Sequence, residues 1–215
     1  MDWARQVIEF VQERPDRFFE LVWAHLRLSL TALALAVLIY VPLGTLFSRL
    51  PRIGANAVGL VSALRVIPSL ALVFLFYPWL GFGTQPALVA LVVLAAPALV
   101  VNTYAGLTNV DAATLEAARG LGMNDAHVFL RVQLPLALPV IIAGMRLAAV
   151  EILASATLAS FVGAKTLGQY ILTGISLLDT TYLLVGGIPI VLLVLATDLV
   201  FGGIERLVTP PTTTT

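Results

Sequence analysis

The chain has 215 residues, of which 60% are hydrophobic and only 11% are charged. Soluble domains carry about 25% charged residues, so this composition excludes an ordinary water-soluble globule and favours a surface that faces lipid. The net charge of zero argues against a nucleic-acid partner, which would need a local excess of Lys and Arg, and the absence of cysteine excludes disulfides and thiolate metal sites.

The first 25 residues are predicted to form an amphipathic N-terminal segment. Charged and apolar side chains alternate there at steps of three and four residues, with a hinge between two helices at Pro15. The segment lacks the uninterrupted apolar core of a cleavable signal peptide. Two alternatives stay open: the segment lies along the membrane surface, or it packs on the flank of the protein itself.

Long apolar stretches follow, and crossing a bilayer core as a helix takes about 20 such residues. Because no stretch alternates with period two, the spans should be helices. The sequence therefore predicts an all-α integral membrane protein with about five transmembrane helices in a membrane domain at residues 26–207, followed by a disordered tail at 208–215. The four clear spans are Leu28–Phe47, Pro86–Leu107, Leu136–Val162 and Tyr182–Ile204, and Ala57–Leu80 is a fifth if Arg65 is tolerated near its end.

The distribution of positive charge predicts the orientation of these spans. The link after the first span is short and contains Arg49 and Arg52, which favours the cytoplasm, whereas the link at residues 78–85 is uncharged, which favours the outside. Alternation then places the amino terminus outside and both the 106–133 segment and the carboxyl terminus inside. Three arginines near the amino terminus oppose this orientation, although acidic residues outnumber them.

The polar segment between the third and fourth spans is predicted to be an elbow of two short helices at residues 109–133. Asp111 is a candidate N-cap for the first helix, and Gly122 is placed to end it in a left-handed conformation. Asn124 is a candidate N-cap for the second helix, which Pro135 should interrupt before the next span. The small side chains of the first helix would let a groove on another protein approach closely.

The spacing of this elbow resembles the EAA loop of binding-protein-dependent ABC importer permeases. The matching positions are Glu116-Ala117-Ala118, Gly122, Val132 and Leu134-Pro135, with Val132 where isoleucine is commoner. In that family the loop is the coupling helix that docks into a cleft on the ATPase. The resemblance implies an ATPase-coupling role for these residues: Glu116, Ala117, Ala118, Gly122, Leu134 and Pro135.

Further motifs resemble the osmoprotectant branch of the same family, which imports glycine betaine, choline and carnitine. They are Val41-Pro42-Leu43-Gly44, Ile67-Pro68-Ser69-Leu70-Ala71-Leu72, Asn102-Thr103-Tyr104, Leu134-Pro135-Leu136-Ala137-Leu138-Pro139, and Ala156 to Ala164 followed by Leu167-Gly168. The chain departs from that branch at Lys165-Thr166, where two glycines are common, and at Arg65, where glutamine is common.

Ionisable groups at membrane depth are costly unless they are paired or solvated, so each is a functional candidate. Arg65, together with Pro68 and Ser69, is a candidate for the gate or translocation path, because a proline bends a helix and frees a carbonyl. The alternative is that Arg65 snorkels to the headgroups. Glu151 either pairs with a basic residue of another helix or faces the aqueous route and favours a cationic ligand. Asp198 is interpreted as a packing group.

The stretch Phe161–Ile175 is too short and too broken to span, and fits an external loop or re-entrant gate. Quaternary ammonium groups bind aromatic faces, so Tyr104, Phe161 and Tyr170 are the candidate contacts along the translocation path. With only two histidines, His25 and His127, far apart in the sequence, no metal site is expected.

The chain contains no phosphate-binding Gly-rich Lys-Ser/Thr motif and no catalytic constellation, so it is not expected to be an enzyme. The resemblance implies that a separate ATPase binds ATP and Mg, that an extracytoplasmic substrate-binding protein delivers the solute, and that a second permease subunit, identical or not, completes the route in the bacterial cytoplasmic membrane. Two alternatives stay open: the same architecture serving an amino acid or ergothioneine, and an ion-coupled secondary transporter using Glu151 and Asp198.

Overall fold

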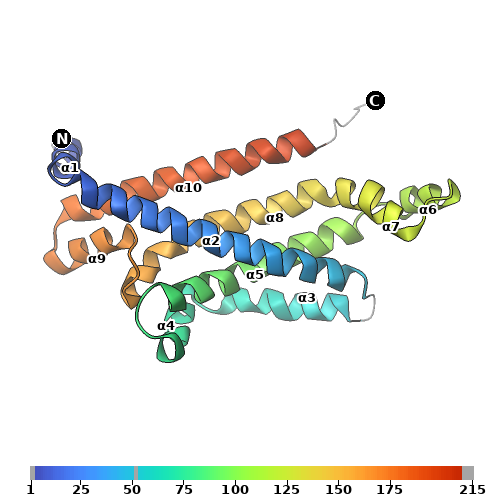
Figure 1. Ribbon diagram of the computed structural model, residues 1–215, viewed down its shortest axis with the longest axis horizontal. Helices are drawn as coiled ribbons and strands as arrows, with labels where there is room; N and C mark the ends of the chain where they lie inside the picture. Colours follow the sequence, from blue (N-terminus) through green and yellow to red (C-terminus); the bar gives the residue numbers. More distant parts are fainter. Residues whose placement is uncertain (1–2, 51–52, 210–215) are drawn as a thin grey trace. The chain divides into compact units, whose positions relative to one another are not determined.

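The computed structural model describes residues 3–50 and 53–209, and all regular secondary structure within them is helical (Figure 1). The long helices are α2 (Pro15–Ser48), α5 (Thr84–Thr108), α8 (Leu134–Ser155) and α10 (Thr180–Val208). The shorter elements are α1 (Trp3–Glu13), α3 (Gly54–Ser62), α4 (Ser69–Leu80), α6 (Ala112–Gly120), α7 (Asp125–Val128) and α9 (Gly168–Leu177), the 3₁₀ turns η1 (Ala63–Val66) and η3 (Ala156–Val162), and the π-turn η2 (Phe129–Gln133).

Four helices of the described chain are long and apolar enough to cross a membrane, and a fifth span arises if one bent pair is counted. That pair is Gly54–Val66 with Ser69–Leu80, bent by 94°. The predicted fold class, an all-α membrane protein with about five spans, is confirmed. The stretch Ala57–Leu80 is bent at Pro68, which has an extended ψ of 134° and disfavours a helical conformation in the residue before it.

The amino-terminal hinge is confirmed: α1 ends at Glu13 and α2 begins at Pro15. Proline is suited to the first position of a helix, because its missing N–H would be unsatisfied there anyway. α2 does not stop at residue 25 but continues to Ser48, so its 34 residues extend for about 50 Å. The second half of the predicted amphipathic segment is therefore the beginning of the first span. The part of the predicted tail beyond Thr209 lies outside the described residues.

The chain divides into two compact units, and each long helix contributes residues to both. The first unit comprises Met1–Leu35, Val66–Ala95 and Ala149–Asp198. Its core cluster contains Leu21, Leu167, Tyr170, Val185 and Ile190, with Phe10 among the side chains packed against it. α1 is thus anchored to the first unit through an apolar face, which favours the second of the two alternatives for this segment.

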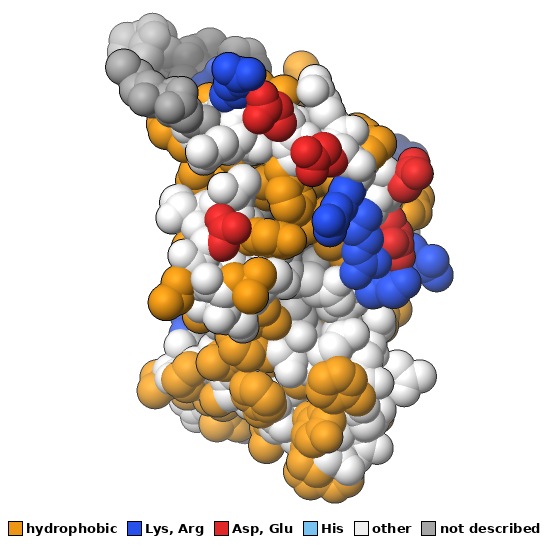
Figure 2. All heavy atoms as spheres, turned by 90° about the vertical axis from the view of Figure 1, so that its left-hand side faces the viewer, with side chains coloured by type: hydrophobic (Ala, Val, Ile, Leu, Met, Phe, Trp, Pro, Cys, Tyr) orange, Lys and Arg blue, Asp and Glu red, His pale blue; other side chains and the backbone are white. Residues whose placement is uncertain are grey.

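Ion pairs join the surface elements of the first unit. Glu20 on α2 accepts from Arg17 at 2.8 Å and from Lys165 at 2.6 Å, and Arg17 also donates to Gln169 on α9 at 2.8 Å. Figure 2 views the molecule from the end at which α1 and α9 lie in Figure 1, and shows acidic and basic side chains close together, with much of the apolar surface gathered elsewhere on that face. These contacts are exposed, so water screens them and they contribute little to stability.

The second unit comprises Ala36–Arg65, Ala96–Ala148 and Leu199–Thr215. Its helices approach closely at small residues. A Cβ added to Gly44 would meet the Thr103 side chain at 2.8 Å, and one added to Gly144 would meet Asn102 at 2.6 Å. Leu107, Ala137 and Ile141 form the buried cluster from which the elbow extends.

Candidate coupling elbow and translocation residues

The first helix of the elbow, α6, begins at the predicted cap. The Asp111 carboxylate accepts from the Ala113 backbone N–H at 3.3 Å and from the Thr114 hydroxyl at 3.2 Å. The cap satisfies a backbone donor that the first helical turn leaves without an intrahelical partner. Ala and Leu in the body of α6 favour helix, so the local sequence specifies both the start and the content of this element.

The predicted left-handed end of α6 is confirmed at Gly122, whose φ is +86°. The Gly122 N–H donates to the Arg119 carbonyl at 2.9 Å, and the Met123 N–H donates to the Ala118 carbonyl at 3.3 Å. These bonds satisfy carbonyls at the helix end, and glycine enters this region of φ without the steric cost of a Cβ. The chain therefore reverses sharply between α6 and α7.

The second helix of the elbow starts at Asn124, as predicted, since the His127 N–H donates to the Asn124 side-chain oxygen at 2.9 Å. Arg119 pairs with Asp125 at 3.3 Å and so links α6 to α7 across the turn. Both side chains are more than half exposed, so this pair contributes little stability. The caps and the turn, rather than this ion pair, define the geometry.

Pro135 does not interrupt the second helix, which corrects the prediction. Residues 125–162 run as one continuous helical span, with the π-turn η2 just before the proline. The Leu134 N–H donates to the Phe129 carbonyl, a bond over five residues. The wider turn accommodates the missing donor and the ring of Pro135 without breaking the helix.

Two residues that sequence reasoning missed attach the elbow to the second unit. The Gln133 amide donates to the Leu107 carbonyl at the end of α5 at 3.0 Å. The Arg49 guanidinium lies 4.5 Å from the centroid of the Phe129 ring, within the range of a cation–π contact. Arg49 entered the sequence analysis only as a topology signal, and its aromatic partner 80 positions away has no local signature.

The outer surface of the elbow is formed by exposed side chains of α6 and of the turn after it. Glu116, Ala117 and Gly122 are exposed, and a Cβ built on Gly122 would meet nothing within 4 Å. Leu121 is 86% exposed, a large apolar group between two glycines that the sequence analysis did not single out. Ala118, by contrast, is buried within the elbow at 7% exposure.

Leu134 and Pro135, the last two residues of the predicted coupling set, lie at the beginning of α8. Leu134 packs against the cluster of Leu107, Ala137 and Ile141, and Pro135 is exposed. Leu134 therefore helps to hold the base of the elbow rather than its outer surface.

The gate candidates Arg65, Pro68 and Ser69 lie around the break between η1 and α4. Arg65 is exposed, Pro68 is the exposed residue before the helix, and Ser69 is the partly buried first residue of α4. The predicted bend at the proline is present. Tyr104, on α5 in the second unit, is partly buried, and its ring lies close to Gly54.

The aromatic candidates Phe161 and Tyr170 belong to two different ring contacts of the first unit. Phe161 is 40% exposed and meets Phe74 edge-on, with 6.5 Å between the ring centroids. Tyr170 is 7% exposed and packs edge-on against Phe10 at 5.8 Å. Burial raises the pKa of Tyr170, and among the described residues its hydroxyl finds no hydrogen-bond partner. The stretch that contains both residues is broken into short elements and is mostly buried.

Glu151 is partly buried, and neither it nor Asp198 is without an interaction partner. Arg146 forms an ion pair with Glu205 of α10 at 3.4 Å within the second unit. Its partner Glu205 lies 59 positions away in the sequence, so no local pattern signals this pair.

Long apolar helices with a capped, exposed elbow between α5 and α8 define a multi-pass transport permease. The family described as binding-protein-dependent transport system inner membrane component matches residues 40–210. The chain belongs to this family, and it is a membrane-spanning permease subunit of an ABC importer.

Several relatives and solved structures are similar over nearly the whole chain. The carnitine transport permease protein OpuCB of Listeria monocytogenes is 38% identical, over 95% of this chain and 94% of its own. The choline transport system permease protein OpuBB of Bacillus subtilis is 37% identical over the same shares. The inward-facing MetNI methionine ABC transporter matches 90% of this chain and 96% of its own, with a TM-score of 0.77 and 25% identity.

Proposed function

We propose that this permease imports a quaternary-amine osmoprotectant such as glycine betaine, choline or carnitine. The observation that carries this proposal is the 36–38% identity, over 95% of the chain, to three permeases whose names specify carnitine, choline or glycine betaine. The fold is also similar to a methionine transporter, but at lower identity. An amino acid is therefore the second candidate solute.

The elbow at residues 109–133 is the surface through which a separate ATPase drives the permease. Glu116, Ala117, Leu121 and Gly122 are exposed together, which supports docking into a cleft. The elbow is rigid because of the caps at Asp111 and Asn124 and the hydrogen bond from Gln133 to the Leu107 carbonyl. A rigid elbow transmits the motion of the ATPase to α5 and α8. ATP and Mg bind to the partner and not to this chain.

Solute reaches the permease from an extracytoplasmic binding protein, and a second permease subunit completes the route. Five spans are too few to enclose a path by themselves. Arg65, Pro68 and Ser69 are proposed to act at the gate, because a bent and interrupted helix lines a path more readily than a regular one. Tyr104, Glu151, Phe161 and Tyr170 are proposed as transient contacts for a cationic solute, and Tyr170 can serve only if its ring leaves the cluster with Phe10.

Uptake of labelled solutes tests the proposed substrate. The permease is expressed with its partner ATPase and binding protein, in a bacterial host that lacks its own osmoprotectant importers. We expect cells to accumulate glycine betaine, choline or carnitine. The uptake of each of these labelled solutes should be inhibited by the unlabelled forms of the other two, and not by methionine or histidine. An ATPase variant that cannot hydrolyse ATP should give no accumulation. Uptake of methionine or histidine alone would overturn the substrate proposal and leave the importer class intact.

A further inference from the structure

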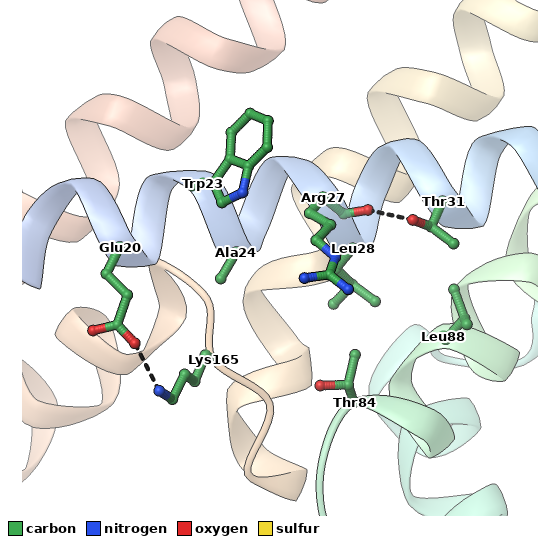
Figure 3. A pocket seen from close by; sticks show the side chains of 9 residues that line it. All are labelled: Glu20, Trp23, Ala24, Arg27, Leu28, Thr31, Thr84, Leu88 and Lys165. Carbon is green, nitrogen blue, oxygen red and sulfur yellow. Dashed lines mark hydrogen bonds and ion pairs between the residues drawn. The ribbon is translucent and has the colours of Figure 1, made fainter.

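The first unit contains a cavity of about 540 Å³ between α2, the start of α5 and the loop after η3, which no residue of the proposed transport function lines. Three charged side chains line it: Glu20 and Arg27 from α2, and Lys165 from the loop. Its apolar wall includes Leu28 and Leu88. Figure 3 shows Arg27 and Leu28 on the side of α2 that faces Thr84, and the Glu20–Lys165 contact at the other end of the cavity.

The charges around this cavity do not balance. Glu20 accepts from Lys165 at 2.6 Å and also from Arg17, which does not line the cavity. Among the described residues, no acidic group lies within ion-pair distance of the Arg27 guanidinium. Two cations and one acid leave a single excess positive charge. The Thr31 and Thr84 side chains also line the cavity. The Thr31 hydroxyl already donates to the Arg27 carbonyl at 2.7 Å, so Thr84 is the one of the two that offers a hydroxyl donor. An anion with several acceptor oxygens is the complementary ligand.

The position of the cavity along the sequence places it at the boundary between hydrocarbon and headgroups. Arg27 directly precedes Leu28, after which no charged residue occurs until Arg49. Thr84 is the first residue of α5, a helix that contains no charged residue. Trp23 lines the cavity and is 67% exposed, and tryptophan is enriched at this depth in membrane proteins. Beyond Arg27, α2 presents exposed Leu30, Leu38 and Ile39.

We propose that this cavity binds the phosphate of an anionic phospholipid, with Arg27 as its principal contact and the acyl chains along the exposed face of α2. Arg27 supplies the positive charge and the hydrogen-bond donors, and Leu28 and Leu88 exclude water from one side of the site. Lys165 does not contact the phosphate while it is paired with Glu20. An arginine without an acidic partner, next to the exposed apolar face of α2, favours a lipid over a small soluble anion. The cavity is lined by none of the residues of the elbow or of the proposed solute path.

Quenching of Trp23 by brominated lipid tests the proposal locally. The full-length chain carrying Trp3→Phe and Trp79→Phe, so that Trp23 alone emits, is reconstituted into phosphatidylcholine vesicles. A small fraction of brominated phosphatidylglycerol or, in parallel, of brominated phosphatidylcholine is included. We expect brominated phosphatidylglycerol to quench Trp23 fluorescence several-fold more strongly than it would if the two lipids were distributed at random around the protein. Arg27→Gln should reduce this preference about fivefold, the factor that one basic residue contributes next to an anionic lipid.

A second variant should strengthen the preference for phosphatidylglycerol instead of weakening it. Glu20→Gln releases Lys165 and raises the excess charge from one to two, so the preference for phosphatidylglycerol should rise about fivefold. Arg206→Gln, which removes an exposed arginine at the end of α10 in the second unit, is the control and should leave the Trp23 signal unchanged.

Three results would overturn the proposal. The first is equal quenching by the two lipids, and the second is a preference that Arg27→Gln leaves intact. The third is a preference that soluble glycerol phosphate abolishes, because the cavity would then be a site for a free phosphate and not for a lipid. None of these measurements depends on solute uptake, so their failure is distinguishable from failure of the proposed transport function.

Discussion

Two short helical segments of this permease use the same kinds of residue for opposite purposes. The elbow (residues 109–133) and the segment at residues 156–177 are both built from short helices that contain several Ala and Gly residues, between longer helices. In the elbow, a Cβ on Gly122 would meet open space. In the segment at 156–177, a Cβ on Gly168 would collide with the Thr157 carbonyl oxygen.

The difference shows that small residues have two structural roles in this chain. In the segment at 156–177, Ala156, Ala159 and Gly168 are buried, and their size lets one stretch of this chain approach another. A further contact, the Ser160–Thr166 hydroxyl bond at 2.7 Å, closes this loop internally. In the elbow, Ala117 and Gly122 are exposed, so their size is available to a partner. Composition alone does not distinguish the two cases.

The largest expected effect is on stability, at Gly168. Gly168→Ala places a methyl group against the Thr157 backbone oxygen, which cannot rotate away, and near the Ser160 hydroxyl, which is bonded to the Thr166 hydroxyl. Overpacking of this kind costs about 3 kcal/mol at the upper end of its usual range. The purified permease should unfold at a markedly lower temperature, which size-exclusion chromatography after heating detects.

Gly187→Ala is the matched control for that substitution, because nothing lies within 4 Å of a Cβ at this position of α10. Its stability should stay within about 1 kcal/mol of the wild type. Equal unfolding temperatures for the two variants would mean that the segment at 156–177 is not packed as described.

The next effect concerns coupling, at Gly122. Gly122→Val introduces a β-branched residue at φ +86°, where even an ordinary side chain costs about 1–2 kcal/mol. The open surroundings leave the rest of the fold intact, so the elbow should change shape while the protein still inserts. Uptake should fall about tenfold or more, the factor equivalent to 1.4 kcal/mol, at an unchanged amount of protein in the membrane.

Gly122→Asn separates backbone strain from contact with the ATPase. Asparagine tolerates the left-handed region better than other residues, so it should retain more uptake than valine if strain is the cause. If both substitutions abolish uptake equally, the ATPase needs the bare backbone of glycine. Unchanged uptake in the valine variant would count against the elbow as the coupling element.

Local signals in the sequence were sufficient for the two caps and the turn of the elbow. Asp111 and Asn124 are caps because their side chains reach backbone donors two or three residues away, and Gly122 adopts the conformation that its position after a helix predicts. Such interactions depend only on neighbours in the sequence. The apolar spans were predictable for the same reason, since hydropathy is a property of a continuous window.

What the sequence could not predict depends on contacts between distant residues. The burial of Ala118 and Tyr170, the cation–π contact of Arg49 with Phe129 and the Arg146–Glu205 pair all require the packed structure. The continuation of the helix through Pro135 depends on a π-turn that no residue pattern signals. Leu121 was missed because an exposed leucine is unremarkable in an apolar sequence, and its position at the tip of the elbow gives it significance.

A smaller effect is expected for docking, at Leu121. This side chain is 86% exposed, so Leu121→Ser should leave the stability of the isolated permease unchanged. If the ATPase cleft buries it, the loss of about 2 kcal/mol of apolar transfer free energy weakens binding about thirtyfold. Titration of the detergent-solubilised permease with its ATPase measures this affinity. Leu207→Ser, at 87% exposure near the end of α10, is the matched control, and an equal loss in both variants would contradict docking through the elbow tip.

The smallest expected effect is on the bracing of the elbow, at Asp111. Asp111→Ala removes the acceptor for the Ala113 N–H and the Thr114 hydroxyl, and loss of a cap costs about 1 kcal/mol. Because the cap stabilises only α6, hydrogen exchange should accelerate about fivefold in residues 112–120 and stay unchanged in α9. Asp111→Asn, which preserves a capping oxygen, should restore slow exchange. If α6 exchanges equally fast in all three proteins, its order comes from packing against η2 and not from the cap, and the elbow would then owe its rigidity to the same kind of contact that stabilises residues 156–177.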